Sequence, residues 1–427
     1  MTALKYLRFV VAMIALGAVV LLFSGKDYPV KILDVQFTAA LQRTILDGTV
    51  FAACLFAGII VLTLLFGRIY CSTLCPLGLA QEIVGLLFRR KIRLQKSNPF
   101  KYILAALVFG VLIGGSAAVV RYIDPYSLFG SAASGAYVGI GAAVAIALIA
   151  LLKRRAFCVH ICPVGAVLGL IAKHSVFQVG IDNRKCVPCG MCAAKCPTGS
   201  IDYKNKKVDN ETCIKCFKCM GVCRRGGIRF GRIPAYPLAM NESRRKMLIG
   251  GAGLAAFAVL AFKSGAIVSK KIAARIKSVI LPAGARSPEK FANNCLNCNL
   301  CVQNCPMKIL KKADSDYPAV HIDLSENFCA FDCHKCGDVC PSGAIRRLSL
   351  SDKRRTQTGL AGVDESKCVK CGLCAMKCPK HAVKKERFED FPRFDSDLCI
   401  GCGACKIACP VGAITVQPVE EQRLLSE

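Results

Sequence analysis

The sequence predicts a multi-pass α-helical membrane domain joined to three small α+β domains built on repeated cysteines. Three observations predict this fold class. Mean hydropathy is +0.44, which is high for a soluble protein. Four apolar segments lie within the first 152 residues. The chain has 29 cysteines, and 24 of them follow one recurring spacing after residue 185.

The apolar segments are each long enough, or nearly so, to cross a hydrocarbon core of about 30 Å. They are Leu7–Phe23, Gly48–Phe66, Tyr102–Val120 and Tyr137–Leu152. Two strongly basic segments, 67–101 and Lys153–Arg155, follow the second and fourth spans, so the positive-inside rule places both in the cytoplasm. Residues 1–281 carry 37 Lys and Arg against 10 Asp and Glu, around these spans. This distribution favours membrane orientation over phosphate binding, and no nucleic-acid partner is expected.

An internal repeat follows the second and fourth spans. Cys71–Gly78 and Cys158–Gly165 both read C-x3-C-P-[LV]-G. Two equivalent hairpins related by an axis along the membrane normal are therefore expected. Three interpretations remain open for the four thiols, which are a further metal centre, redox-active disulfides, or a structural interface beside the next domain. The thiols are those of Cys71, Cys75, Cys158 and Cys162.

Apart from Cys54, the remaining cysteines form six runs, arranged in three pairs, and five of the runs read C-x2-C-x2-C-x3-C. This run binds [4Fe–4S] clusters in bacterial two-cluster ferredoxins, where the fourth cysteine of each run ligates the cluster of the other run. Structural zinc uses two C-x2-C pairs without a third cysteine at that spacing, and disulfides have no reason to repeat it. The crossing predicts six clusters. Their ligands are the Cys186 set (Cys186, Cys189, Cys192, Cys223), the Cys213 set (Cys213, Cys216, Cys219, Cys196), the Cys295 set (Cys295, Cys298, Cys301, Cys340), the Cys329 set (Cys329, Cys333, Cys336, Cys305), the Cys368 set (Cys368, Cys371, Cys374, Cys409) and the Cys399 set (Cys399, Cys402, Cys405, Cys378).

One run departs from the pattern, because three residues separate Cys329 from Cys333 where the others have two. We expect the loop to tolerate this insertion, or the cluster there to be a variant. The domain boundaries follow from the spans and runs. They are 1–172 for the four-helix membrane domain, 173–235 for a cytoplasmic ferredoxin, 236–281 for a connecting segment, 282–347 for the second ferredoxin, and 348–427 for the third with its tail.

The connecting segment contains Arg244-Arg245 followed by an apolar run to Phe262. This order resembles a twin-arginine export signal, which suits domains loaded with clusters before they leave the cytoplasm. Extended to Val268, the run predicts a fifth span, after which residues 282–427 are near charge balance. The second and third ferredoxins are therefore expected in the periplasm. The alternative is a buried or interfacial helix that leaves all six clusters in the cytoplasm.

Four spans, two C-x3-C-P motifs and a cytoplasmic two-cluster ferredoxin resemble the NapH-type membrane iron–sulfur quinol dehydrogenases associated with periplasmic nitrate reductase. The remainder, with its twin-arginine segment and two further ferredoxins, resembles the NapG-type four-cluster subunit. The resemblance implies an inner-membrane protein in contact with lipid and the quinone pool. It also implies that quinol is oxidised and that electrons pass along the clusters to a terminal reductase outside.

Asp124, in an outer loop before Pro125, is the candidate proton acceptor for quinol oxidation, and its alternative role is to cap a helix or turn. Two other functions compete with this one. The first is a maturation or metal-reducing factor that uses the C-x3-C-P thiols. The second is a ferredoxin-type electron hub in the cytoplasm.

Overall fold

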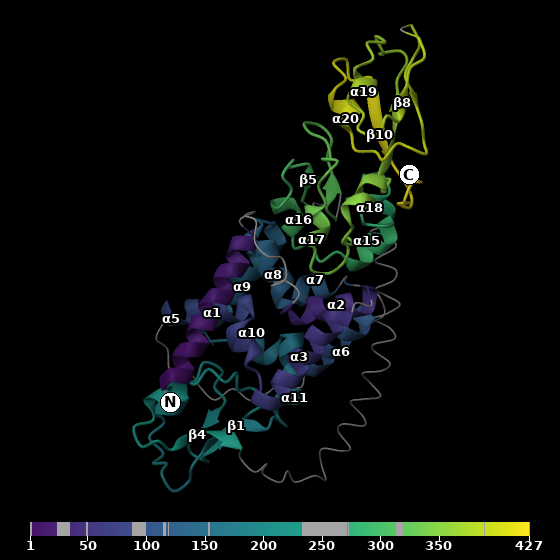
Figure 1. The fold of residues 1–427 in the computed structure, drawn as a ribbon. Helices are drawn as coiled ribbons and strands as arrows, with labels where there is room; N and C mark the ends of the chain where they lie inside the picture. Colours follow the sequence, from purple (N-terminus) through teal and green to yellow (C-terminus); the bar gives the residue numbers. More distant parts are fainter. Residues whose placement is uncertain are drawn as a thin grey trace. The chain divides into compact units, whose positions relative to one another are not determined.

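The computed structural model describes residues 2–23, 35–47, 50–87, 100–113, 117, 119–152, 154–232, 271, 273–312, 319–387 and 389–426. The chain divides into two compact units. The first comprises 1–21, 31–114 and 119–264, and the second comprises 22–30, 115–118 and 265–427. Figure 1 shows the ribbon coloured along the sequence, with the helices and strands labelled. The twin-arginine segment and the expected fifth span lie outside the described residues.

The first unit contains two copies of one helical arrangement. In each copy a helix leads into a long apolar helix, then a short helix with the first motif cysteine, then a helix that begins at the motif proline. The last helix of each copy packs against the long apolar helix of the other copy: α11 contacts α3, and α5 contacts α9. The helices are α1 (Thr2–Phe23), α2 (Phe37–Asp47), α3 (Val50–Phe66), α4 (Tyr70–Thr73), α5 (Pro76–Leu87), α6 (Phe100–Ile113), α7 (Val120–Ile123), α8 (Pro125–Ala133), α9 (Tyr137–Leu152), α10 (Ala156–His160) and α11 (Pro163–Ala172).

Among the described helices, α1 alone is both long and apolar enough to cross a membrane by itself. Helices α8 and α9 meet the same criterion together, but a break bends them by 116°. Helices α3, α6 and α11 are apolar and shorter. Within the third expected span, Tyr102–Val120, helix α6 covers Tyr102 to Ile113, and the separate short helix α7 begins at Val120.

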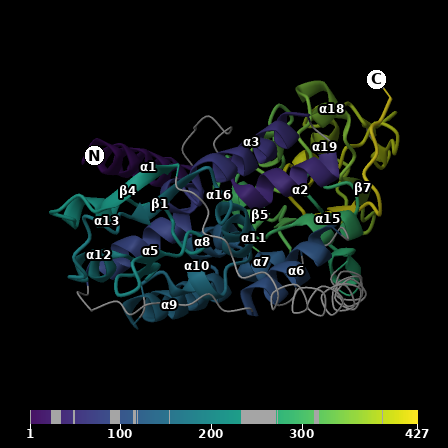
Figure 2. The ribbon, with the colours of Figure 1, turned by 90° about the horizontal axis from the view of Figure 1, so that it is seen from below.

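The first unit ends in a small α+β domain. Strands β1 and β4 pair antiparallel, with Phe177 opposite Arg232 and Ile181 opposite Ile228, and they lie side by side in both views (Figures 1 and 2). This pair joins the two ends of the segment that carries the Cys186 and Cys213 sets. Its elements are β1 (Phe177–Ile181), α12 (Met191–Lys195), β2 (Ile201–Asp202), β3 (Lys207–Val208), α13 (Lys218–Val222) and β4 (Ile228–Arg232).

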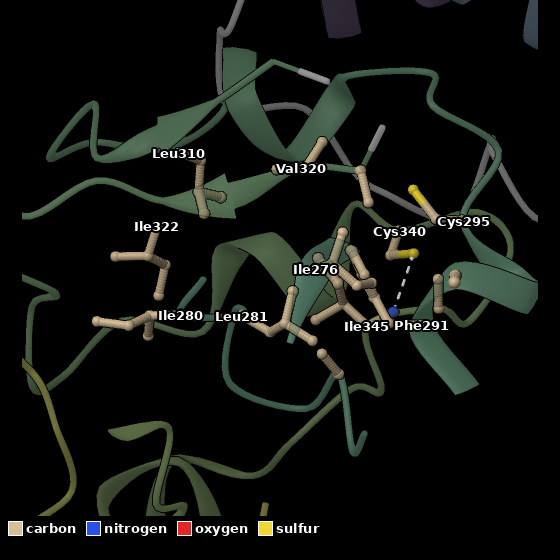
Figure 3. Close-up of a cluster of buried hydrophobic side chains, with 14 of the residues drawn as sticks. Ile276, Ile280, Leu281, Phe291, Cys295, Leu310, Val320, Ile322, Cys340 and Ile345 are labelled. Carbon is tan, nitrogen blue, oxygen red and sulfur yellow. Dashed lines mark hydrogen bonds between the residues drawn. The ribbon is translucent and has the colours of Figure 1, made fainter. Parts of the chain in front are cut away.

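The second unit holds two further small domains; the third ferredoxin has the same order of elements, and the described part of the second has only the inner strand pair β5–β6. An apolar core gathers Ile276, Phe291, Val320 and Ile345 with Cys295 and Cys340 of one set (Figure 3). The last ferredoxin is closed by β7 and β10, which pair antiparallel. The elements are α15 (Pro288–Asn294), α16 (Leu300–Gln303), β5 (Leu310–Lys311), β6 (His321–Ile322), α17 (Lys335–Asp338), α18 (Leu350–Arg355), β7 (Gly359–Val363), α19 (Leu373–Met376), β8 (Val383–Lys384), β9 (Arg393–Phe394), α20 (Ala404–Ile407) and β10 (Ile414–Pro418).

Candidate functional site

The structure brings the predicted cysteine sets together. Four cavities are each lined by three cysteines of one run and the fourth cysteine of the paired run. The largest, about 210 Å³, is lined by the Cys186 set. In the other two sets the fourth cysteine also lies near the first three. Cys196 opposes ionisation of Cys216 in the Cys213 set, and Cys340 opposes ionisation of Cys298 in the Cys295 set. The crossed grouping is the one expected for two-cluster ferredoxins.

The loop that carries the first three cysteines of a run turns through a left-handed residue. This residue follows the second cysteine and precedes a short helix that holds the third. Glycine takes this conformation without steric cost, whereas other residues take it less readily. The φ angles are 73° for Gly190, 58° for Phe217, 58° for Asn299, 79° for Gly372 and 85° for Gly403. In the run with the inserted residue, the corresponding His334 has a φ of −128°, so the insertion changes the turn.

Backbone N–H groups point at the sulfur of the fourth cysteine. Gly227 N donates to Cys223 Sγ at 3.2 Å, and Ala413 N donates to Cys409 Sγ at 3.2 Å. Such bonds are one of the means by which a protein sets the potential of a cluster. The thiols themselves are buried, and burial raises the pKa of Cys216 to about 12 and that of Cys402 to about 11. Cluster binding to these sets therefore requires proton release. Cavities with four cysteines and N–H donors fit [4Fe–4S] clusters.

The second and third ferredoxins meet at their cysteine loops. Cys329 N donates a hydrogen bond to the carbonyl of Cys402 at 2.9 Å. A Cβ at Gly403 would lie 2.7 Å from Leu324, so the loop carrying the Cys399 set packs closely on the second ferredoxin. The Cys329 and Cys399 sets are thus neighbours within the second unit.

Two arginines form hydrogen bonds between the two C-x3-C-P motifs. Each arginine lies three residues before the first cysteine of one motif and contacts the other motif. Arg155 Nη1 donates to the carbonyl of Cys71 at 2.8 Å. Arg68 Nη2 donates to the carbonyl of Cys158 at 3.2 Å and lies 3.8 Å from Cys71 Sγ. Both guanidinium groups are fully buried. Each motif is therefore held in place by a side chain from the other.

The motif glycines let the arginines approach. A Cβ on Gly78 would lie 2.8 Å from the Cys71 carbonyl and 3.3 Å from Arg155 Nη1. A Cβ on Gly165 would lie 2.7 Å from both the Cys158 carbonyl and Arg68 Nη2. The proline before each glycine begins a helix, where a missing N–H costs nothing. The spacing C-x3-C-P-x-G thus describes one close-packed unit.

The four motif thiols lie together in one apolar cluster with Ile214 and Cys216 of the first ferredoxin. Burial raises the pKa of Cys75, Cys158 and Cys162, and the neighbouring motif thiols raise it further. None of the cysteines forms a disulfide in this structure. Across the described ranges, no three His, Cys, Asp or Glu side chains converge as ligands of a single metal ion. The three interpretations of these thiols stay open.

Glu82 ties this region to the first ferredoxin. Its carboxylate accepts from Arg155 at 2.5 Å, from Arg8 at 3.1 and 3.2 Å, and pairs with Lys218 at 2.6 Å. Lys218 lies between two cysteines of the Cys213 set. A second link joins Lys101 to Glu211 at 2.7 Å. The Cys213 set is therefore the one that faces the helices of the first unit.

Asp124 is buried and caps helix α8. Its carboxylate accepts from the backbone N–H groups of Tyr126 and Ser127, each at 3.0 Å, and from the Thr38 hydroxyl. Burial raises its pKa above the ordinary value, although these donors oppose the shift. The geometry accounts for the capping alternative, and the role in proton transfer stays a prediction.

Several residues in this site were not found by sequence reasoning. Arg68 and Arg155 lie in the two segments that the sequence analysis used only for their positive charge, and Glu82 lies in the first of these segments. The signal was present, because R-x2-C-x3-C-P-x-G occurs in both repeats. An arginine at the same offset in both copies indicates a shared contact better than a charge bias.

Known protein families match the segments that carry the C-x3-C-P motifs and the ferredoxin cysteines. Residues 49–95 and 136–182, which contain the two C-x3-C-P motifs, match the family described as "4Fe-4S binding domain". Families described as "4Fe-4S dicluster domain" match 178–224, 209–309, 328–382 and 361–416. The prediction of several [4Fe–4S] ferredoxin domains is confirmed.

Curated relatives share about a third of the chain. The methylamine utilization ferredoxin-type protein MauN of Paracoccus denitrificans is 34% identical over 31% of this chain and 48% of its own length. The ferredoxin-type protein NapH of Escherichia coli is 29% identical over 36% of this chain and 58% of its length. The uncharacterized protein MJ0750 of Methanocaldococcus jannaschii is 32% identical over 38% of this chain and 72% of its length. The chain belongs to the NapH-type family of ferredoxin-type iron–sulfur proteins.

The predicted resemblance to NapH-type proteins is confirmed. The chain spans about half the length of the MauN and NapH relatives that it matches. The matches agree in giving this NapH-type chain several [4Fe–4S] domains.

Proposed function

We propose that the protein is a multi-pass membrane electron carrier that accepts electrons from membrane quinol and passes them through six [4Fe–4S] clusters to a partner reductase. The observation that carries this proposal is the packing of Cys216 in one apolar cluster with the four motif thiols. It gives the first ferredoxin an inward-facing set, the Cys213 set, and an outward set, the Cys186 set. An electron entering from the helical domain therefore has an ordered route.

The direction of the route is part of the proposal. The basic segments favour a cytoplasmic first ferredoxin, and the twin-arginine segment with the near-neutral C-terminal part favours a periplasmic NapG-type half. Four apolar helices (α1, α3, α6 and α9) fall where the sequence places spans, which supports a multi-pass inner-membrane domain of residues 1–172. The remaining domain limits are proposed as 173–235, 236–281, 282–347 and 348–427.

Two measurements test this function. A tag at the C-terminus that reacts only from outside the inner membrane of intact spheroplasts should be accessible. Quinol, the reduced form of the quinone, should bleach the visible absorption of the clusters when it is added to purified, cluster-loaded protein. A C-terminus on the inside would instead support the cytoplasmic electron hub. Failure of quinol to bleach the clusters would remove quinol as donor.

A second function is favoured by the two buried arginines, Arg68 and Arg155, that hold the C-x3-C-P motifs. Two buried cations beside four buried thiols stabilise negative charge, as a metal ion bound by thiolates or a reactive thiolate requires. We therefore keep a maturation or metal-reducing role as the alternative. Metal beyond about 24 irons per chain, lost when Cys71, Cys75, Cys158 and Cys162 are all replaced by alanine, would support it. An unchanged metal content in that variant would contradict a metal site there.

A further inference from the structure

A groove in the first unit lies where the helical domain meets the ferredoxin. It has a volume of about 230 Å³ and is lined by apolar residues of α1 and α3, by Tyr70 and Thr73 of α4, and by Phe217 of the ferredoxin. An engineered apolar cavity of about 150 Å³ in another protein binds benzene, so this groove has room for one substituted six-membered ring. On one side it is bordered by Leu7, which is 62% exposed on the apolar helix α1. A hydrophobic molecule could therefore enter along this helix.

Phe217, which lines the groove, occupies an unusual backbone position. It follows Cys216 and has a φ of 58°, in the place where three other runs carry glycine. A bulky residue in the left-handed region is strained, and such strain gathers at functional sites. The Phe217 ring packs edge-on against Phe230, with centroids 5.1 Å apart. The sequence thus keeps an aromatic ring between the groove and the Cys213 set at a conformational cost.

Arg8 supplies an unpartnered donor on the same groove. Its side chain is 5% exposed, and its terminal nitrogens bond Glu82 and the Ser72 carbonyl. Its buried Nε–H has no acceptor among the residues that the structure describes. Leaving a buried N–H without a partner is unfavourable, so a ligand oxygen that accepts a hydrogen bond from it would bind favourably. Thr73 donates its hydroxyl hydrogen to Ile69 and keeps lone pairs free to accept a hydrogen bond.

We infer that this groove binds the ring of a membrane quinone. Arg8 donates to a ring oxygen, Thr73 accepts from the hydroxyl of the reduced form, and the apolar side chains of α1 and α3 contact the ring and the start of its tail. The inference rests on the proposed quinol donor and names its binding site. It places that site beside the first C-x3-C-P motif and the Cys213 set, whereas the sequence suggested Asp124 in a different loop.

Photolabelling tests the site with the full-length, cluster-loaded protein in detergent micelles. An azido-substituted quinone should label peptides from residues 2–23 and 59–74. Leu7→Trp fills the groove from an exposed position and should weaken quinone binding about tenfold or more, with iron content unchanged. Val10→Trp is the matched control, because Val10 is 52% exposed on the same helix and does not line the groove. Its binding should equal that of the wild type.

The outcomes separate the site from the function. Labelling confined to the segment around Asp124, or equal loss of binding in both tryptophan variants, would overturn the groove while quinol bleaching of the clusters still supported the donor. Absence of both labelling and bleaching in the wild type would overturn the donor and the site together. Labelling at the two predicted peptides, with loss in Leu7→Trp alone, would establish the groove.

Discussion

Arg155 Nη1 donates a hydrogen bond to the backbone carbonyl of Cys71, 2.8 Å away and 84 residues earlier in the chain. Arg68 makes the equivalent bond to Cys158 from the other repeat. Each repeat therefore contributes to the other the cation that holds its first cysteine. Neither motif is complete by itself, so the two hairpins form a single site whose parts fold together.

Gly78→Ala and Gly165→Ala should each destabilise the first unit by about 1–3 kcal/mol, because the new methyl group would press on a cysteine carbonyl and an arginine that are both buried. Thermal unfolding in detergent, followed by circular dichroism, measures the effect. Gly58→Ala and Gly141→Ala are the controls. Neither added Cβ meets another atom within 4 Å, so the better helix propensity of alanine should leave stability unchanged or raise it by up to about 1 kcal/mol. Equal loss in all four variants would contradict the close-packed glycine contacts.

Glu82→Gln should cost about 3–5 kcal/mol of stability, because it leaves Arg8 and Arg155 buried without their counter-charge. The same thermal unfolding assay measures it. Arg229→Gln removes an ion pair with Asp182 at an exposed position of the same unit and should change stability by no more than about 1 kcal/mol. A Glu82→Gln protein as stable as the Arg229→Gln control would show that the ion cluster does not hold the ferredoxin against the helices.

Acid should remove the contribution of Glu82. Burial opposes ionisation of this carboxyl, but Arg155, Arg8 and Lys218 outweigh burial and hold its pKa well below the ordinary range. A lowered folded-state pKa stabilises the protein above the unfolded value, about 4.3, and this stabilisation is lost as pH falls below it. The difference in melting temperature between wild type and Glu82→Gln should be constant from about pH 6 to 8 and shrink below about pH 4.5. Because both proteins would lose clusters in acid to the same extent, the difference between their melting temperatures isolates the effect of Glu82. A difference that grew on acidification would contradict the lowered pKa of Glu82.

The cysteine sets were open to prediction because their ligand spacing is local. The run from Cys186 to Cys196 fixes a loop within eleven residues, and the crossing to Cys223 follows from the pairing of two runs. The brace between Arg155 and Cys71 joins distant positions, so no single window of sequence contains it. The third apolar segment also differed from expectation, because Ala117 and Val119, which lie inside the predicted span, are not helical.

Cys196→Ser should damage the cluster assigned to the Cys213 set and leave the Cys186 set intact, although Cys196 belongs to the first run of the pair. Serine is a poorer cluster ligand than a thiolate, so about four irons per chain should be lost. Iron analysis and electron paramagnetic resonance of the reduced protein measure this result. Cys192→Ser is the matched control and should affect the Cys186 set. Exchange of the two spectroscopic losses would show that each run ligates its own cluster without crossing.

The contact between Cys329 and Cys402 predicts that the Cys329 and Cys399 clusters are magnetically coupled. Their loops share a 2.9 Å hydrogen bond, so the spectrum of the fully reduced protein should show broadening from two neighbouring paramagnetic clusters. Cys405→Ser removes a ligand of the Cys399 set and should sharpen the signal of the Cys329 set. Cys371→Ser alters the Cys368 set, at the other cluster of the same ferredoxin, and should leave the broadening in place. Equal sharpening in both variants would mean that the Cys329 cluster is coupled to both clusters of the third ferredoxin. It would contradict a specific coupling through the contact between Cys329 and Cys402.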